Sequence, residues 1–154
     1  MIIFLDIDGV MVPANSWKRP EILEDGFPAF SSISTVALNR LISYSNADIL
    51  LTTSHKSEYI INTWKEIFRR RSINFNEINV LPENTNYLNR KDELLQFIKT
   101  SKLSDDFIII DDDKSLNTLP PPIKKKLIQT SSSMGLTQSI ADKALKIFKE
   151  FETV

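Results

Sequence analysis

The sequence predicts a three-layer α/β/α sandwich with a central parallel sheet. Four apolar runs are continuous rather than alternating, which is typical of strands covered by helices on both faces. Segments with apolar residues at three- and four-residue spacing lie between these runs and indicate amphipathic helices. Strands that alternate with helices favour βαβ units, whose strands are parallel.

The predicted strands are short and rich in isoleucine and leucine. The four stronger ones cover Ile2–Asp6, Ala47–Thr53, Phe107–Asp111 and Lys126–Thr130. A weaker fifth strand, Glu77–Pro82, stops at a proline, which cannot donate a hydrogen bond to a neighbouring strand.

The predicted helices fill the gaps between the strands. They cover Thr35–Tyr44, His55–Arg71, Lys91–Lys99 and Gln138–Glu152, and Thr137 is placed to cap the last of them. Residues 12–34 fit neither period, so we interpret them as a long loop or flap within a single domain of residues 1–154.

The composition excludes several classes of protein. The 154 residues favour one domain with a real core, and 42% hydrophobic with 25% charged residues is typical of a soluble protein. The 19 basic and 20 acidic residues nearly cancel, so no global field attracts nucleic acid or a membrane. The absence of cysteine excludes disulfides and thiolate chemistry. No stretch reads as a signal peptide or a bilayer span, so we expect a cytoplasmic protein without a membrane partner.

Polar side chains follow the carboxyl ends of three predicted strands, where parallel α/β sheets bind ligands. The first strand ends in carboxylates, the second in hydroxyls and the strand at 107–111 in carboxylates again, while two cations open the helix before it. These residues are Asp6 and Asp8; Thr52, Thr53 and Ser54; Asp111, Asp112 and Asp113; and Arg90 and Lys91.

Such a cluster has restricted chemistry. Carboxylates gathered at one place raise each other's pKa, and a hard cation such as Mg²⁺ removes that cost. Hydroxyls and a cation beside the metal suit a phosphate group. One carboxylate can then attack phosphorus and a second can act as general acid and base. The pattern therefore predicts a Mg²⁺-dependent phosphatase.

Four segments in order, FLDIDGV, ILLTTSHK, RKDELL and FIIIDDD, resemble the four motifs of the haloacid dehalogenase (HAD) superfamily of phosphotransferases. The segment LIQTSSSMGLTQSIADKALKIF also resembles the tail of a small bacterial group of HAD domains. The resemblance implies a Rossmann-like fold, a bound Mg²⁺ and an aspartyl-phosphate intermediate. The gaps between the motifs leave no room for the large cap domain of many members.

The resemblance also implies roles for the acidic residues. Asp6 is expected to be the nucleophile and a metal ligand. Asp8 is expected to be the acid/base and to offer its backbone carbonyl to the metal. Asp111 is expected to bind Mg²⁺ directly, and Asp112 directly or through water.

The phosphate ligands are less tightly defined by the motifs. Thr53 is preferred over Thr52, because many members end the second strand with Ser/Thr-Ser-Trp-Arg, and Ser54 follows in the same segment. Lys91 is expected to hold phosphate and nucleophile together, with Arg90 as the alternative. His55 is expected at the edge of the site or as a helix cap.

An uncapped site suits a large or exposed substrate, such as a phosphorylated nucleic-acid end, and the resemblance to phosphatase domains of polynucleotide end-repair enzymes favours the same class. Small phosphate esters and a catalytically silent HAD-like binding module remain as alternatives. A signalling receiver domain uses similar residues, but its acidic pair comes first and its phosphate acceptor later, whereas here the double aspartate comes last.

For Asp113 we expect a solvated or helix-capping role.

Overall fold

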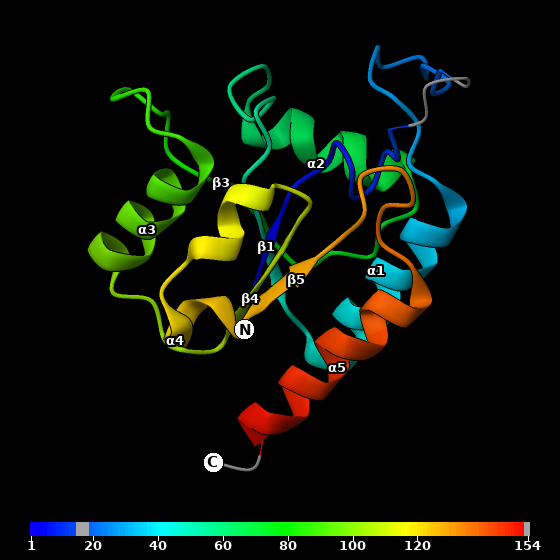
Figure 1. Ribbon diagram of the computed structural model, residues 1–154. Helices are drawn as coiled ribbons and strands as arrows, with labels where there is room; N and C mark the ends of the chain where they lie inside the picture. Colours follow the sequence, from blue (N-terminus) through cyan, green and yellow to red (C-terminus); the bar gives the residue numbers. More distant parts are fainter. Residues whose placement is uncertain (15–18, 153–154) are drawn as a thin grey trace.

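The computed structural model, which describes residues 1–14 and 19–152, has a central parallel sheet with helices on both faces (Figure 1). All five predicted strands are present, which confirms the three-layer sandwich. The elements in chain order are β1 (Ile2–Leu5), α1 (Ser32–Ser45), β2 (Asp48–Leu51), α2 (Ile61–Arg70), β3 (Ile78–Val80), α3 (Arg90–Ser101), β4 (Phe107–Asp111), the 3₁₀ helix η1 (Lys114–Thr118), α4 (Pro121–Lys124), β5 (Leu127–Gln129) and α5 (Gln138–Glu152).

The strand order β3-β2-β1-β4-β5 defines where a ligand can bind. All four pairings are parallel, and β1 lies between β2 and β4. The chain leaves β1 on one side, builds β2 and β3, and returns on the other side of β1 with β4. The crevice between the carboxyl ends of β1 and β4 is therefore the topological switch point, the usual ligand site of such sheets.

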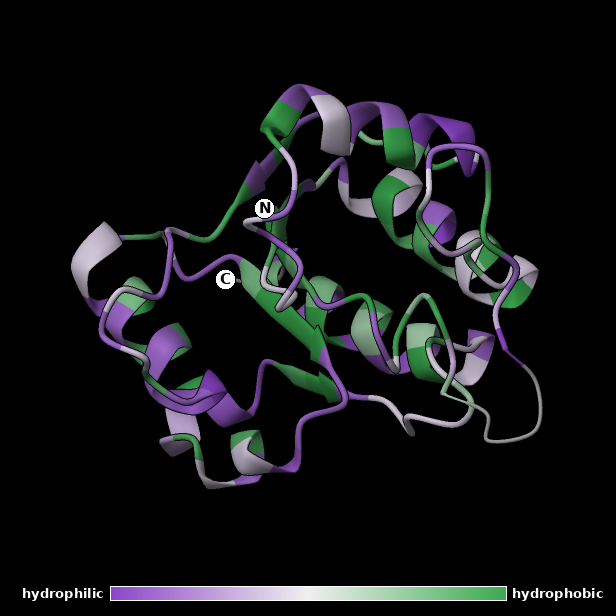
Figure 2. Cartoon of the chain, turned by 90° about the horizontal axis from the view of Figure 1, so that it is seen from above, coloured by the Kyte–Doolittle hydropathy of each residue, from purple (hydrophilic) through white to green (hydrophobic). Residues whose placement is uncertain are grey.

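The two faces of the sheet bury separate apolar clusters. Ile3 and Leu5 of β1 pack with residues of α1, α2 and α5, whereas Phe4 packs with residues of α3 and η1. Figure 2 shows hydrophobic strands at the centre and hydrophilic residues along the outer helices. Because successive strand residues point to opposite faces, each strand end directs one of its residues toward α3 and the next away from it.

Helices α1 and α5 lie side by side, and their ends follow ordinary capping rules (Figure 1). Ser31 caps α1 by accepting a hydrogen bond from Ser34 N at 3.1 Å, and Asn46 ends it in the left-handed conformation. Thr137 Oγ1 accepts from Ile140 N at 3.3 Å, which confirms the cap predicted for α5.

Helix α2 is shorter than predicted. The apolar spacing predicted a helix from His55, but α2 begins at Ile61 and the preceding residues form turns. Two tertiary contacts explain the difference: Trp64 Nε1 donates to the backbone carbonyl of Lys56 at 3.2 Å, and the Lys56 side chain pairs with Glu93. Trp64 is fully buried, as its position in the apolar spacing predicts.

The segment between β1 and α1 is fastened to the rest of the fold. Its residues 15–18 lie outside the described residues, and α1 takes its last three residues, 32–34. We call residues 19–31 the flap. The guanidinium of Arg71, whose side chain is 2% exposed, donates to both carboxylate oxygens of Asp25, at 2.7 and 2.9 Å, and to the backbone carbonyl of Phe27. The flap is thus anchored at the end of α2.

The search for membrane spans found nothing in the described residues: each helix is too short or too polar to cross a bilayer.

Candidate active site

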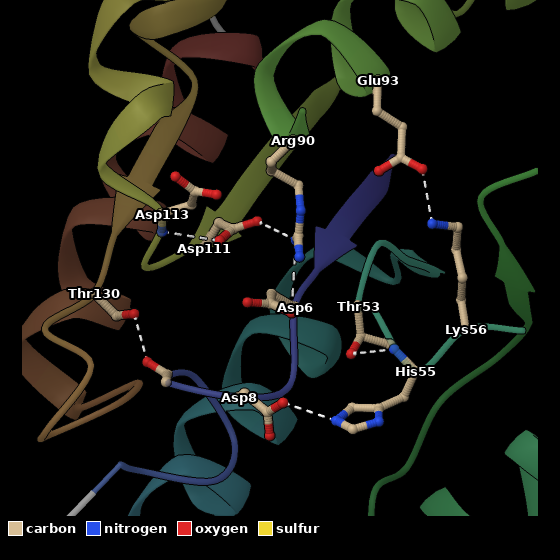
Figure 3. A network of polar contacts seen from close by, with 11 residues as sticks. Asp6, Asp8, Thr53, His55, Lys56, Arg90, Glu93, Asp111, Asp113 and Thr130 are labelled. Carbon is tan, nitrogen blue, oxygen red and sulfur yellow. Dashed lines mark hydrogen bonds and ion pairs between the residues drawn. The ribbon is translucent and has the colours of Figure 1, made fainter. Parts of the chain in front are cut away.

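Three carboxylates meet at the switch point. Asp6 follows β1, Asp111 ends β4 and Asp112 comes next, and one carboxylate oxygen of each lies within 4.8 Å of the others. Asp6 and Asp111 are buried, and Figure 3 shows their side chains facing each other across the crevice. Residues more than 100 positions apart therefore share one small volume, as a common metal ligand set requires.

The electrostatics of this cluster disfavour three free negative charges. Burial, and next the charge of Asp111, raise the pKa of Asp6 to about 8 against the opposing charge of Arg90. Burial also raises the pKa of Asp111. Buried carboxylates ionise readily only when a positive charge compensates them. A hard divalent cation such as Mg²⁺ supplies that charge and prefers oxygen ligands.

Gly9 has no side chain, which allows the Asp112 carboxylate to lie close to the turn after β1. Its φ of +78° is unfavourable for other residues, and a Cβ on it would lie 2.0 Å from Oδ2 of Asp112. Thr130 Oγ1 donates to the Gly9 carbonyl at 2.7 Å and holds the turn after β1 (Figure 3). The DG dipeptide of the first motif thus leaves room for the third carboxylate.

The cation at the site is Arg90. Its Nη1 lies 2.8 Å from Oδ2 of Asp111 and 3.6 Å from Oδ1 of Asp6 (Figure 3). Asn89 caps α3 by accepting from Asp92 N at 2.8 Å, so the first helical residue is held facing the crevice. Lys91 is next on the helix, about 100° further round its axis. It forms no ion pair with any residue in the described part of the chain.

The two threonines after β2 differ in their hydrogen bonds. Thr52 N donates to Leu5 O at 3.0 Å, so Thr52 lies beside Asp6 and continues the sheet register. Its Oγ1 is buried and, among the described residues, has no hydrogen-bond partner. Thr53 Oγ1 already accepts from His55 N at 3.2 Å. A buried hydroxyl without a partner is costly, so Thr52 is the one that fits an oxygen of a bound ligand.

A hollow of about 470 Å³ opens beside this threonine. Its lining includes Thr52, Ser54 and Arg90, and also Asn84 and Leu88. The predicted phosphate-binding segments therefore border one solvent-accessible space next to the acidic cluster. We refer to this space as the hollow.

Sequence reasoning did not assign a buried ion pair that also lines the hollow. Lys56 Nζ lies 2.7 Å from Oε2 of Glu93, and the two side chains are 8% and 10% exposed (Figure 3). Glu93 is three residues after Arg90 and therefore shares its side of α3. That spacing, together with the acidic and basic types in RKDE and SHK, is the signal that could have identified the pair.

The Asp8 side chain lies outside the carboxylate cluster. It is 59% exposed, and its Oδ2 is 2.8 Å from Nε2 of His55, whose Nδ1 is 3.1 Å from Glu58 (Figure 3). Partial burial lowers the pKa of His55, but the hydrogen bonds and charges of Glu58 and Asp8 outweigh it and raise the pKa overall. His55 thus lies at the edge of the site and holds Asp8 at its mouth.

Asp113, the third aspartate of the run 111–113, caps the next helix. Its Oδ1 accepts from Ser115 N at 2.9 Å at the start of η1, which confirms the predicted capping role. Its own backbone N–H donates to Oδ1 of Asp111 at 3.0 Å and orients that carboxylate.

A doubly wound parallel sheet, with carboxylates from β1 and β4 at its switch point and a cation from the helix before β4, defines a HAD-type protein. Residues 2–141 match the family model described as the HAD domain in Swiss Army Knife RNA repair proteins, and the chain belongs to this family. Membership in the HAD superfamily indicates a hydrolase. The searches of curated proteins and of solved structures returned no match.

Proposed function

We propose that this protein is a Mg²⁺-dependent phosphatase that removes terminal phosphates from nucleic-acid ends through an Asp6 phosphoenzyme. The observation that carries the proposal is the buried Asp6, which lies between two further carboxylates, the Arg90 guanidinium and the unpartnered Thr52 hydroxyl. The family description, which names RNA repair proteins, supports the class of substrate.

Asp6, Asp111 and Asp112 are the side chains that would hold Mg²⁺, together with the backbone carbonyl of Asp8. Their oxygens, their mutual distances and the raised pKa of Asp6 all fit such an ion. When bound, the cation supplies positive charge that neutralises the carboxylates and the oxygens of the phosphate.

The side chains of the site divide the reaction between them. Arg90 and Thr52 bind phosphoryl oxygens and hold phosphorus in line with the Asp6 carboxylate. Asp6 forms a bond to phosphorus while the bond to the leaving oxygen breaks, and Asp8 donates a proton to that oxygen. Asp8 then takes a proton from a water molecule that attacks phosphorus, which releases inorganic phosphate and restores Asp6. His55 positions the Asp8 carboxylate for both proton transfers.

This assignment uses Thr52 and Arg90 where the motifs alone favoured Thr53 and Lys91. Arg90 contacts the acidic cluster, and the buried Thr52 hydroxyl has no hydrogen-bond partner among the described residues, which supports these two over Lys91 and over Thr53, whose Oγ1 accepts from His55 N. The intact set of acid, cation and free hydroxyl disfavours a catalytically silent module, because a buried unpartnered hydroxyl stabilises nothing in the absence of a ligand.

The test is phosphate release from single-stranded oligonucleotides with a 3′- or 5′-terminal phosphate and from glycerol phosphate, with Mg²⁺ or with EDTA. We expect Asp6→Asn to lower turnover about 1,000-fold or more and EDTA to abolish it. Asp106→Asn is the matched control, because this exposed aspartate lies just before the opposite end of β4. Turnover that survives both EDTA and Asp6→Asn would contradict the proposal.

A further inference from the structure

An exposed aromatic side chain stands on the loop between β3 and α3. Tyr87 is 93% exposed, and its φ of +51° is an uncommon conformation for a bulky residue. Asn84 closes the loop: its Oδ1 accepts from Leu88 N at 2.9 Å and its Nδ2 donates to Leu88 O at 2.7 Å. Tyr87 N also donates to the Asn84 carbonyl. The loop is thus built to present the ring, at a cost in backbone strain.

This loop borders the candidate active site. Asn84 and Leu88, on either side of Tyr87, both line the hollow that also contains Thr52 and Arg90. Tyr87 is three residues before Arg90, so the chain limits their Cα separation to about 11 Å, which is the scale of one nucleotide. In Figure 1 the loop lies at the amino end of α3, at the edge of the sheet where the strands end.

Two lysines each follow a residue that lines the hollow. Lys91 follows Arg90 on α3, and Lys114 follows Asp113 at the start of η1, which packs against α3. Neither lysine forms an ion pair with a residue in the ranges that the structure describes. Two such cations suit the phosphates of a strand that leaves the site.

The phosphates of a bound strand should lie away from the uncompensated acidic side chain that lines the hollow. Glu93 is neutralised by Lys56, and Asp113 is engaged as a helix cap. Glu83 remains on the same loop as Tyr87. A strand can therefore place its base at the Tyr87 side and its phosphates at the lysine side.

We propose that Tyr87 stacks on the base of the terminal nucleotide whose phosphate reaches Asp6, and that Lys91 and Lys114 bind the phosphates of the nucleotides that follow. This inference rests on the proposed function and narrows the substrate to a single strand, because a base is free to stack on a side chain only when it is unpaired. Stacking tolerates every base, so the site selects strand ends without selecting sequence.

The first experiment compares kcat/KM for a phosphorylated hexanucleotide with kcat/KM for glycerol phosphate, which has no base. Stacking is worth about 1–3 kcal/mol per base, so Tyr87→Ala should lower the ratio of the two values by about 5- to 150-fold. Tyr87→Phe should keep the ratio. Ile60→Ala is the control. Ile60 is likewise largely exposed, at 72%, but it precedes α2 and does not belong to the Tyr87 loop. RNA and DNA versions of the hexanucleotide distinguish the two kinds of strand. An unchanged ratio in Tyr87→Ala would overturn the inference.

The second experiment separates this inference from the proposed function. Binding of the phosphorylated hexanucleotide to Asp6→Asn is measured by fluorescence anisotropy at several salt concentrations, so it does not need turnover. Replacement of Lys91 or Lys114 by Gln should reduce the slope of log K against log salt by about 0.7 each, and Tyr87→Ala should weaken binding at every salt concentration. Binding that Tyr87→Ala leaves unchanged overturns the stacking even if the enzyme proves to be a phosphatase. If the wild-type protein shows no turnover but binding still depends on Tyr87, the stacking is retained and the proposed phosphatase activity is rejected.

Discussion

Arg90 and Lys91 are neighbours in the sequence but have different surroundings. Successive residues of a helix point about 100° apart, so the cap at Asn89 that directs Arg90 to the carboxylates directs Lys91 away from them. Which of the two cations contacts the carboxylates therefore depends on the rotation of α3 about its axis.

This rotation gives a prediction for the two cations. With glycerol phosphate as substrate, Arg90→Ala should lower kcat/KM about 100-fold or more, because it removes the charge beside the transferred phosphoryl group. Lys91→Ala should have a far smaller effect. Phosphate release measures both variants, and circular dichroism checks that each is folded. The opposite order of effects would return the role to Lys91.

The sequence predicts which segments border the carboxylate cluster more surely than it predicts which residue of each segment faces it. Asp6, Asp111 and Asp112 were predictable because an apolar strand that ends in aspartates places them at the sheet edge, wherever the neighbouring strand lies. The motifs favoured Thr53 and Lys91 and kept Thr52 and Arg90 as alternatives. Which of two adjacent residues faces the crevice depends on strand register and helix rotation, and these are fixed by tertiary packing that the motif pattern does not contain.

At the scale of elements, the strands were predicted well and one helix boundary was not. A continuous apolar run locates a buried strand to within one or two residues, as for Phe107–Asp111. The helix predicted from His55 begins at Ile61, because the contacts of Lys56 with Trp64 and with Glu93 on α3 draw the intervening residues into turns. Such long-range contacts override local periodicity and are invisible to it.

The anchoring of the flap by Asp25 and Arg71 predicts a pH-dependent stability. Hydrogen bonds from Arg71 lower the pKa of Asp25 below its ordinary value. The pair therefore stabilises the fold fully above the unfolded-state pKa of about 4, and this contribution is lost as the pH falls through the lower folded-state pKa.

Asp25→Asn should lower the free energy of unfolding by about 2 kcal/mol at pH 7, because it leaves the buried Arg71 charge without its partner. The difference from the wild type should shrink below pH 4, as urea unfolding at several pH values would measure. Asp142→Asn is the control: it breaks an exposed pair with Arg40, which should be worth less than about 1 kcal/mol. A deficit that persists unchanged at pH 2 would show that the Asp25 charge is not the cause.

At the scale of the whole molecule, the carboxylate cluster should couple metal binding to folding, because the ligands come together only in the native chain. At 100 times its dissociation constant, Mg²⁺ should stabilise the fold by about 2.7 kcal/mol and raise the melting temperature by roughly 5–10 °C. The measurement is thermal unfolding with Mg²⁺ and with EDTA.

Gly9→Ala should remove most of this Mg²⁺-dependent increase, because the new methyl group displaces the Asp112 carboxylate. Gly26→Ala is the matched control: its φ of +80° imposes the same backbone strain, but apart from its chain neighbours no described residue has an atom within 4 Å of a Cβ there. Both variants should melt below the wild type in EDTA, and only Gly26→Ala should retain the gain on adding Mg²⁺. Equal gains in the two variants would remove Asp112 from the ligand set.

The hydrogen bonds of Arg71 also determine whether the flap must move before a substrate can bind under the proposed function. A lid that must close adds a slow step to each catalytic cycle. The flap cannot swing without breaking the four hydrogen bonds that Arg71 donates to Asp25, Phe27 and Pro28. The described flap therefore keeps its position whether or not a substrate is bound. Under the proposed function, a strand end can reach Asp6 without waiting for this segment to open.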